Sequence, residues 1–236
     1  MTLPIGPVVD PLPSGQPPAR KVFEGATVRL EPLDPTRHGD ALYRSAHGDA
    51  ARDSLWTYMG SGPFADESDF RGWIERCSPS EDPLFFAVVD ARSDEAVGMV
   101  SYLNIVPAMG TIEVGHIWYA PAVQRTRLPT EAMYLMFRHV FDDLGYRRLE
   151  WKCNALNAKS RAAALRLGFT FEGIFRQHMI VKGRNRDTAW FSMLDREWPA
   201  VRANMERWLA PENFDAEGRQ RVSLSALNRE RAPVPG

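Results

Sequence analysis

The chain contains little cysteine and no excess of charge of either sign. Only two of its 236 residues are cysteines, Cys77 and Cys153, too few for a disulfide framework or a cysteine-rich zinc site. The 29 basic and 30 acidic residues give a formal net charge of −1, so the basic surface that nucleic-acid binding requires is missing. The five histidines show no metal-ligand spacing. We therefore expect no nucleic-acid partner and no metal site.

Long apolar runs are also absent. No stretch approaches the roughly 20 apolar residues that span a bilayer, and the run over 84–89 suffices for one buried strand only. The first residues lack the basic and apolar regions of a secretory signal. These absences predict a cytoplasmic protein without a membrane partner. The composition, 44% hydrophobic and 25% charged, is typical of a folded globular chain.

The two ends of the chain differ from its middle. The prolines of residues 1–21 are Pro4, Pro7, Pro11, Pro13, Pro17 and Pro18. Because proline fixes φ and lacks an amide donor, we expect an extended arm there. Residues 210–236 are polar and mixed in charge, which predicts a tail in which Val222, Leu224 and Leu227 are the candidates for docking. Residues 22–209 are then the single expected domain.

The hydrophobic pattern of this domain switches between the strand and helix periods. The expected strands are 22–33, 84–89, 96–106, 111–119, 147–153, 169–181 and 186–194. The expected helices are 35–46, 66–77, 130–144, 158–167 and a last one that begins near Pro199. Gly145 is expected to follow the third helix at its C′ position, and Asn157 to cap the fourth. Strands interspersed with helices predict an α/β or α+β protein with a mixed sheet.

One block of residues resembles a known family. Asn157-Ala-Lys-Ser160, the alanine-rich helix after it and Leu167-Gly168-Phe169 resemble the closing motif of the GNAT superfamily of acyl-CoA N-acyltransferases. Glu-Gly-Ile-Phe-Arg at 172–176 resembles the branch of ribosomal-protein N-terminal acetyltransferases (RimJ/RimL-like). The resemblance covers about residues 22–194. It implies an α/β fold whose central sheet is mixed, mostly antiparallel and flanked by helices.

The same resemblance implies a reaction and its partners. An acyl group, most simply acetyl, passes from a coenzyme A thioester to a primary amine of a protein N-terminus or of a small molecule. Acetyl-CoA or another acyl-CoA is the expected co-substrate, and the proline-rich arm suggests a second copy of the chain as a partner. Two alternatives stay open, a non-catalytic acyl-CoA-binding module and an N-acyltransferase with a bulkier donor such as succinyl-CoA.

The expected diphosphate-binding loop departs from the family pattern. That pattern is Gln/Arg-x-x-Gly-x-Gly/Ala, whereas residues 124–129 read Gln-Arg-Thr-Arg-Leu-Pro and lack both small residues. Such a loop presents backbone amides at a helix N-terminus to an anion, and Arg125 and Arg127 are expected to replace lost donors with charge-assisted bonds. The expected cofactor-binding residues are Ile117, Trp118, Tyr119, Arg125, Thr126, Arg127, Leu128, Thr130, Asn157, Ser160 and Arg161.

Acyl transfer to an amine needs a group that removes a proton. A lysine-type amine has a pKa of about 10.4, so it is almost fully protonated at neutral pH. The resemblance implies an acidic residue on strand 111–119, and we assign the role of base to Glu113. Alternation places His116 on the opposite face unless a bulge intervenes, so His116 is expected to be a core or pocket-wall residue. Backbone amides near 117–119 are the expected oxyanion donors.

The departing thiolate needs a hydrogen-bond donor. Many members of the superfamily carry a tyrosine four residues before the motif glycine, but this position is Ala164 here. The resemblance to the ribosomal-protein branch implies instead that Ser160, oriented with Asn157, contacts the thiolate. The simpler interpretation is that Asn157 caps the helix and Ser160 lies in its first turn, and both interpretations are compatible.

Overall fold

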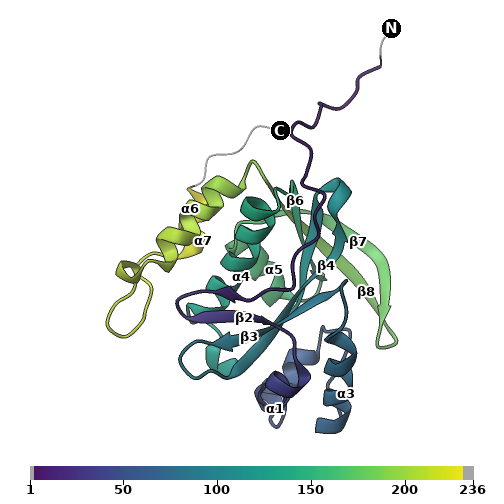
Figure 1. Ribbon diagram of the computed structural model, residues 1–236, viewed down its shortest axis with the longest axis vertical. Helices are drawn as coiled ribbons and strands as arrows, with labels where there is room; N and C mark the ends of the chain where they lie inside the picture. Colours follow the sequence, from purple (N-terminus) through teal and green to yellow (C-terminus); the bar gives the residue numbers. More distant parts are fainter. Residues whose placement is uncertain (1–2, 231–236) are drawn as a thin grey trace.

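The strands of residues 3–230, the part of the chain that the computed structural model describes, form one mixed sheet (Figure 1). They are β1 (Phe23–Glu24), β2 (Val28–Pro32), β3 (Leu84–Asp90), β4 (Ala96–Val106), β5 (Thr111–Tyr119), β6 (Arg148–Asn154), β7 (Thr170–Val181) and β8 (Arg184–Leu194). Their spatial order is β1-β2-β3-β4-β5-β6-β8-β7. Neighbours are antiparallel except β5 and β6, which are parallel. The expected mixed, mostly antiparallel sheet is confirmed.

Helices cover both faces of the sheet. They are α1 (Pro35–Ala46), α2 (Ala50–Asp53), α3 (Glu67–Cys77), α4 (Leu128–Arg138), α5 (Ala158–Arg166), α6 (Trp198–Leu209) and α7 (Leu224–Arg229). Short 3-10 segments are η1 (Ser54–Trp56), η2 (Pro107–Met109), η3 (Pro121–Val123) and η5 (Pro211–Asn213), and η4 (His139–Asp143) is a π-helical turn. Helices α1 and α3 pack on one face, and α4 to α7 on the other.

The apolar run of β3 supplies two separate cores. Leu84, Phe86 and Val88 face the main core under α4 to α7. Phe85, Ala87 and Val89 face the second core under α1 and α3. Side chains of a strand alternate between the two faces of its sheet, so a strand that is covered on both faces is apolar at every position. This is why the run over 84–89 is unbroken.

The expected strand over 22–33 is wrong in one respect, because the chain turns back within it. Gly25, Ala26 and Thr27 form the turn of a hairpin that joins β1 to β2. The Glu131 carboxylate of α4 accepts hydrogen bonds from the amides of Ala26 and Thr27, at 2.6 and 2.8 Å. A Cβ atom at Gly25 would lie 2.8 Å from this carboxylate, so a larger residue there would have to displace the Glu131 side chain from the turn.

Helix α4 begins at Leu128, two residues before the expected start, and includes Pro129 in its first turn. Proline suits that turn because its missing amide would have no helical partner. The helix ends at Arg138, and the π-helical turn η4 continues it to Asp143. Gly145 follows with φ of 62°, as a C′ glycine does.

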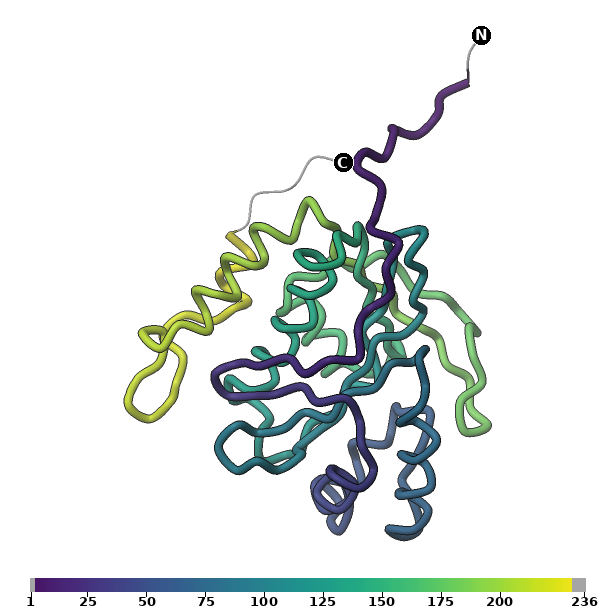
Figure 2. The backbone as a smooth tube through the Cα atoms, viewed as in Figure 1, coloured from purple at the N-terminus to yellow at the C-terminus, as the bar shows by residue number. Residues whose placement is uncertain are grey.

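The segments outside the expected domain contact its body. The Tyr146 hydroxyl donates to the carbonyl of Gln16 (2.7 Å), and the Arg20 guanidinium donates to the carbonyls of Ser78 and Ser80. Figure 2 shows that the arm follows the body before it turns away towards the N-terminus. At the other end, α7 buries Leu224 and Leu227 in the main core, whereas Val222 is 37% exposed.

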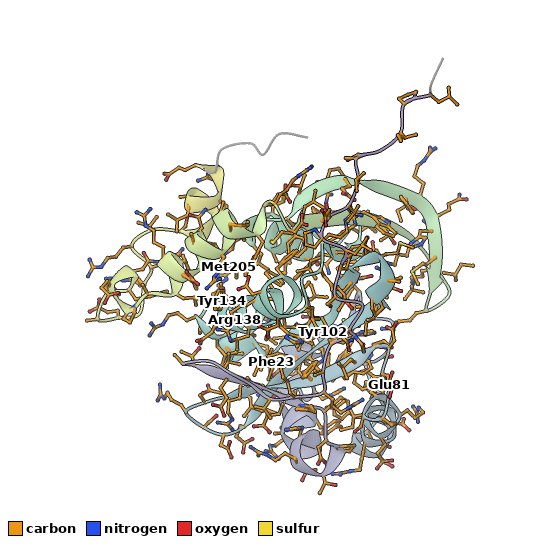
Figure 3. All side chains as sticks on the ribbon, turned by 45° about the horizontal axis from the view of Figure 1, so that its top comes forward. Phe23, Glu81, Tyr102, Tyr134, Arg138 and Met205 are labelled. Atoms are coloured by element: carbon orange, nitrogen blue, oxygen red, sulfur yellow. The ribbon has the colours of Figure 1, made fainter. Side chains whose placement is uncertain are left out.

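Helix α6 packs directly on α4. Tyr134 and Arg138 of α4 and Met205 of α6 lie together where the two helices meet (Figure 3). The Tyr134 hydroxyl donates to Glu206 at 2.8 Å. The chain after β8 therefore covers the helix whose first turn begins the candidate site. Within residues 3–230, no helix is both long and apolar enough to cross a membrane.

Candidate active site

Strand β5 carries a bulge at His116. Ser101 of β4 is opposite Gly115 and Met99 is opposite Trp118, so β5 has one extra residue in this interval. His116 takes the left-handed φ of 50°, as one residue of a bulge can. The extra residue reverses the alternation for the rest of the strand.

The bulge brings Glu113 and His116 to the same face of the sheet. Glu113 lies between Ile112 and Val114, which face the main core, so it points to the second core. The His116 ring packs 4.9 Å from the ring of Phe85, which belongs to the second core. The exception named with the prediction of opposite faces therefore applies, because a bulge does intervene.

The parallel pairing of β5 and β6 ends early. Its last pair is Val114 with Trp151, although β5 continues to Tyr119 and β6 to Asn154. The amide of Ala120 donates to the carbonyl of Val97 in β4 at 2.7 Å. Successive amides of a strand alternate in direction, so those of Ile117 and Tyr119 point to the opposite side, into the gap between β5 and β6. These are two of the amides that the sequence predicted to meet the thioester.

The loop before α4 presents further amides. Within residues 3–230, the amides of Arg125, Arg127 and Leu128 donate to no protein acceptor. The Thr126 amide and hydroxyl both donate to the carbonyl of Val123, which closes the loop. Arg125 adopts φ of 65°, a left-handed conformation that glycine adopts without steric cost. The loop thus keeps the backbone form of an anion-binding helix start without its small residues.

Aromatic residues from the C-terminal segment support this loop. The guanidinium of Arg127 lies 4.6 Å from the ring centroid of Phe214, which itself packs against Trp208. Arg166 lies 4.8 Å over the Trp208 ring and donates to the hydroxyl of Thr130 in the first turn of α4. Sequence reasoning missed these contacts because Phe214 lies in the segment that it assigned to a polar tail.

The start of α5 has the expected cap. The side-chain oxygen of Asn157 accepts from the amide of Ser160 at 3.0 Å, so the capping role of Asn157 is confirmed. The Ser160 hydroxyl accepts from the Trp151 indole at 3.0 Å, and its hydrogen is directed to the sulfur of the buried Cys153. Arg161 donates to the carbonyl of Ala155 at 3.4 Å. The contact of these residues with coenzyme A stays a prediction.

Glu113 is buried and already bonded. It is 5% exposed, and one carboxylate oxygen lies 2.8 Å from Lys152 Nζ and 2.6 Å from Asn104 Nδ2. Lys152 also pairs with Glu150 at 2.7 Å and lies over the ring of Trp190. Burial raises the pKa of Glu113, while Lys152 and Asn104 act in the opposite direction.

The predicted site residues form an elongated strip. The bond between Arg166 and Thr130 places the last turn of α5 beside the first turn of α4. Ser160 lies six residues back along α5, or about 9 Å along its axis. The strip thus runs from the amides of the loop, along the gap between β5 and β6, to the start of α5. This strip suits an elongated molecule that carries a phosphate group at one end and a reactive group at the other.

Known proteins share this architecture and sequence pattern. The family model described as "Acetyltransferase (GNAT) domain" matches residues 27–170 of this chain. The crystal structure of a GCN5-related N-acetyltransferase from Brucella melitensis is 48% identical, with a TM-score of 0.89, over 92% of this chain and 97% of that chain. A structure from Chromobacterium violaceum ATCC 12472, provisionally assigned to the GNAT acetyltransferases, is 45% identical with a TM-score of 0.77 over 85% of this chain and 99% of that chain.

A curated relative agrees with these structures. The protein of Bacillus subtilis (strain 168) that is provisionally named ribosomal N-acetyltransferase YdaF is 26% identical over 186 residues, which are 75% of this chain and 96% of that protein. Because the GNAT family model matches more than half of the residues of the chain, the chain belongs to the GNAT family of acetyltransferases and is an acyl-CoA-dependent N-acyltransferase.

Proposed function

We propose that this N-acyltransferase takes its acyl group from acetyl-CoA and delivers it to the amine at a protein N-terminus. The observation that carries the donor site is the open gap between β5 and β6 beside the start of α4. Within the described chain, the loop amides of Arg125, Arg127 and Leu128 have no protein acceptor, and alternation along β5 directs the amides of Ile117 and Tyr119 into the gap. Amides at a helix start bind phosphate, and amides along a strand bind an extended amide-containing arm.

Each part of the strip has a proposed role. The loop amides, with Arg125 and Arg127, hold the diphosphate. The amides of Ile117 and Tyr119 hold the arm and the developing oxyanion. The Ser160 hydroxyl, whose oxygen accepts from Trp151, turns its hydrogen from the Cys153 sulfur to the thiolate as the thiolate leaves.

The acceptor is inferred from the relatives. The B. subtilis protein carries the word ribosomal in its name, and a ribosomal-protein-serine acetyltransferase of Escherichia coli (strain K12) is 31% identical over 86 residues, 36% of this chain and 48% of that protein. These names favour a protein N-terminus over a small-molecule amine. The α-amine also has a lower pKa than a lysine side chain, about 8, so it is the easier acceptor to deprotonate.

We take acetyl rather than succinyl as the acyl group, because the relatives are named acetyltransferases. We further infer a reducing compartment such as the cytoplasm, because Cys77 and Cys153 are both buried free thiols.

The test combines binding with turnover. Calorimetry is expected to show acetyl-CoA binding, and thiol release is expected with a peptide that has a free α-amine but not with its N-acetylated form. Substituting Arg125 and Arg127 by Ala weakens binding, whereas Arg92→Ala, on an exposed turn between β3 and β4, does not. Absence of acetyl-CoA binding by the wild-type chain would reject the proposal. Equal turnover with small amines would reject the assigned acceptor.

A further inference from the structure

The His116 side chain has one nitrogen bonded to the protein and one that is open. Its Nδ1 lies 2.8 Å from the hydroxyl oxygen of Ser101, a residue that is fully buried. Within residues 3–230, no protein group bonds Nε2, and Nε2 is not among the buried atoms without a partner. It therefore remains accessible from outside the protein.

The Ser101 hydroxyl fixes which nitrogen carries the hydrogen. This hydroxyl donates to the carbonyl of Gly115 at 3.2 Å, and a carbonyl can only accept. A serine has one hydroxyl hydrogen, so its oxygen must accept from the histidine if both contacts are satisfied. Nδ1 then carries the hydrogen, and Nε2 presents a lone pair.

The position of the ring follows from the bulge. His116 lies where β5 separates from β6, two residues after the last parallel pair and one residue before the first strand amide that faces the gap. The bulge turns the ring onto the face of Glu113 and against Phe85. An acceptor amine that approaches a thioester in the gap from this face would pass the His116 ring.

We propose that His116 is the general base of the reaction and that Nε2 takes a proton from the acceptor amine. This inference rests on the proposed function. The ammonium form of the amine gives one proton to Nε2, and the neutral nitrogen then attacks the thioester carbonyl. The tetrahedral intermediate collapses as the C–S bond breaks, the second proton of the nitrogen passes to the thiolate, and the imidazolium returns its proton to water. The products are the amide, the thiol and one released proton.

His116 suits this role better than Glu113. The Glu113 carboxylate is held by Lys152 and Asn104, so it would have to lose a buried ion pair to accept a proton from substrate. The groups that face the His116 ring are Phe85 of β3 and Ser101 of β4, and Glu113 is the charged residue on its own strand and face. Burial lowers the pKa of His116, so the ring is neutral and able to accept at pH 7.

The experiment compares three variants with wild type in thiol release from acetyl-CoA, with the free-amine peptide as acceptor. His116→Gln is expected to lower kcat/KM by about 10²- to 10⁴-fold and to remove the acidic limb of the pH profile. That limb has its midpoint below the ordinary histidine pKa of about 6.5 in wild type. Ser101→Ala is expected to change the midpoint of the limb. His178→Gln, a matched change on the exposed β7, is expected to leave both unchanged.

Two further measurements separate catalysis from folding. Protection from thermal unfolding by acetyl-CoA is expected to persist in His116→Gln, and added imidazole is expected to restore part of the turnover of His116→Ala. Wild-type turnover and pH profile in His116→Gln would overturn the inference, as would loss of the acidic limb in Glu113→Gln alone. If wild type itself releases no thiol with any amine, it is the proposed function that fails.

Discussion

The Arg127 guanidinium lies 4.6 Å from the ring centroid of Phe214, although 86 positions separate the two residues in the sequence. One belongs to the loop that we assign to the diphosphate and the other to the segment after α6. The contact fixes the direction of a long cationic side chain before any ligand arrives. Holding a side chain in its bound conformation in advance lowers the entropy that binding removes.

We expect Phe214→Ala to weaken acetyl-CoA binding. A cation–π contact of a partly exposed pair is worth about 0.5–1 kcal/mol, which corresponds to a two- to fivefold increase in Kd. Titration calorimetry measures it, with Phe214→Tyr as the variant that keeps an aromatic face. Equal affinities of the Ala and Tyr variants would show that the ring does not position Arg127.

Arg125 carries a side chain in the left-handed region of backbone conformation. We expect Arg125→Gly to be more stable than Arg125→Ala by about 1 kcal/mol, because only glycine adopts φ of 65° without a steric cost. Both variants lose the same charge, so their difference reports on the backbone alone. Chemical denaturation measures the two free energies of unfolding, and an Ala variant at least as stable as the Gly variant contradicts the argument.

Lys152 neutralises a buried carboxylate. We expect Lys152→Met to lower the free energy of unfolding by about 3–5 kcal/mol at pH 8, because Glu113 is left charged and without its cation. Burial already raises the pKa of Glu113, and loss of Lys152 raises it further. Since protonation then favours the folded state, the destabilisation becomes smaller as the pH falls below this pKa.

Urea denaturation at pH 5 and pH 8 tests that prediction. The double variant Lys152→Met with Glu113→Gln supplies the control, since it carries no buried charge at this position. We expect it to be more stable at pH 8 than the single variant and less dependent on pH. The same loss of stability at both pH values in the single variant would mean that packing, not charge, explains the effect.

The two thiols are expected to be unreactive in the folded protein. Burial raises the pKa of Cys77 to about 11 and also raises that of Cys153, so little thiolate forms at pH 8. A disulfide reagent such as DTNB is expected to titrate neither thiol in native protein and both in guanidinium chloride. Rapid reaction of a native thiol would show that one of the two is exposed by local opening.

Local sequence patterns predicted those helices, strands and turns that are determined by residues close to them in the sequence. The unbroken apolar run of β3, the cap at Asn157 and the glycine after η4 each depend on neighbouring residues, and all three are confirmed. The β1–β2 turn was missed because the carboxylate that binds its amides comes from Glu131, about a hundred positions later. No local pattern contains that information.

In the candidate site, too, the features set by neighbouring residues were predicted and those set by distant residues were not. Its residues on β5, the loop and α5 were named from a motif, and the structure arranges them along one strip. The relation between Glu113 and His116 was left dependent on a bulge, whose presence only the pairing with β4 shows. Alternation along a single strand cannot show how its partner is aligned.

Helix α4 joins the ligand site to the opposite edge of the sheet. Its first turn follows the loop that we assign to the diphosphate, while Glu131, in that same turn, holds the amides of Ala26 and Thr27 in the N-terminal hairpin. With this assignment, occupation of the loop by a nucleotide is expected to restrain a turn that the nucleotide does not touch. We expect deuterium uptake at these two amides to slow when coenzyme A binds, so that a remote hairpin reports on the state of the site.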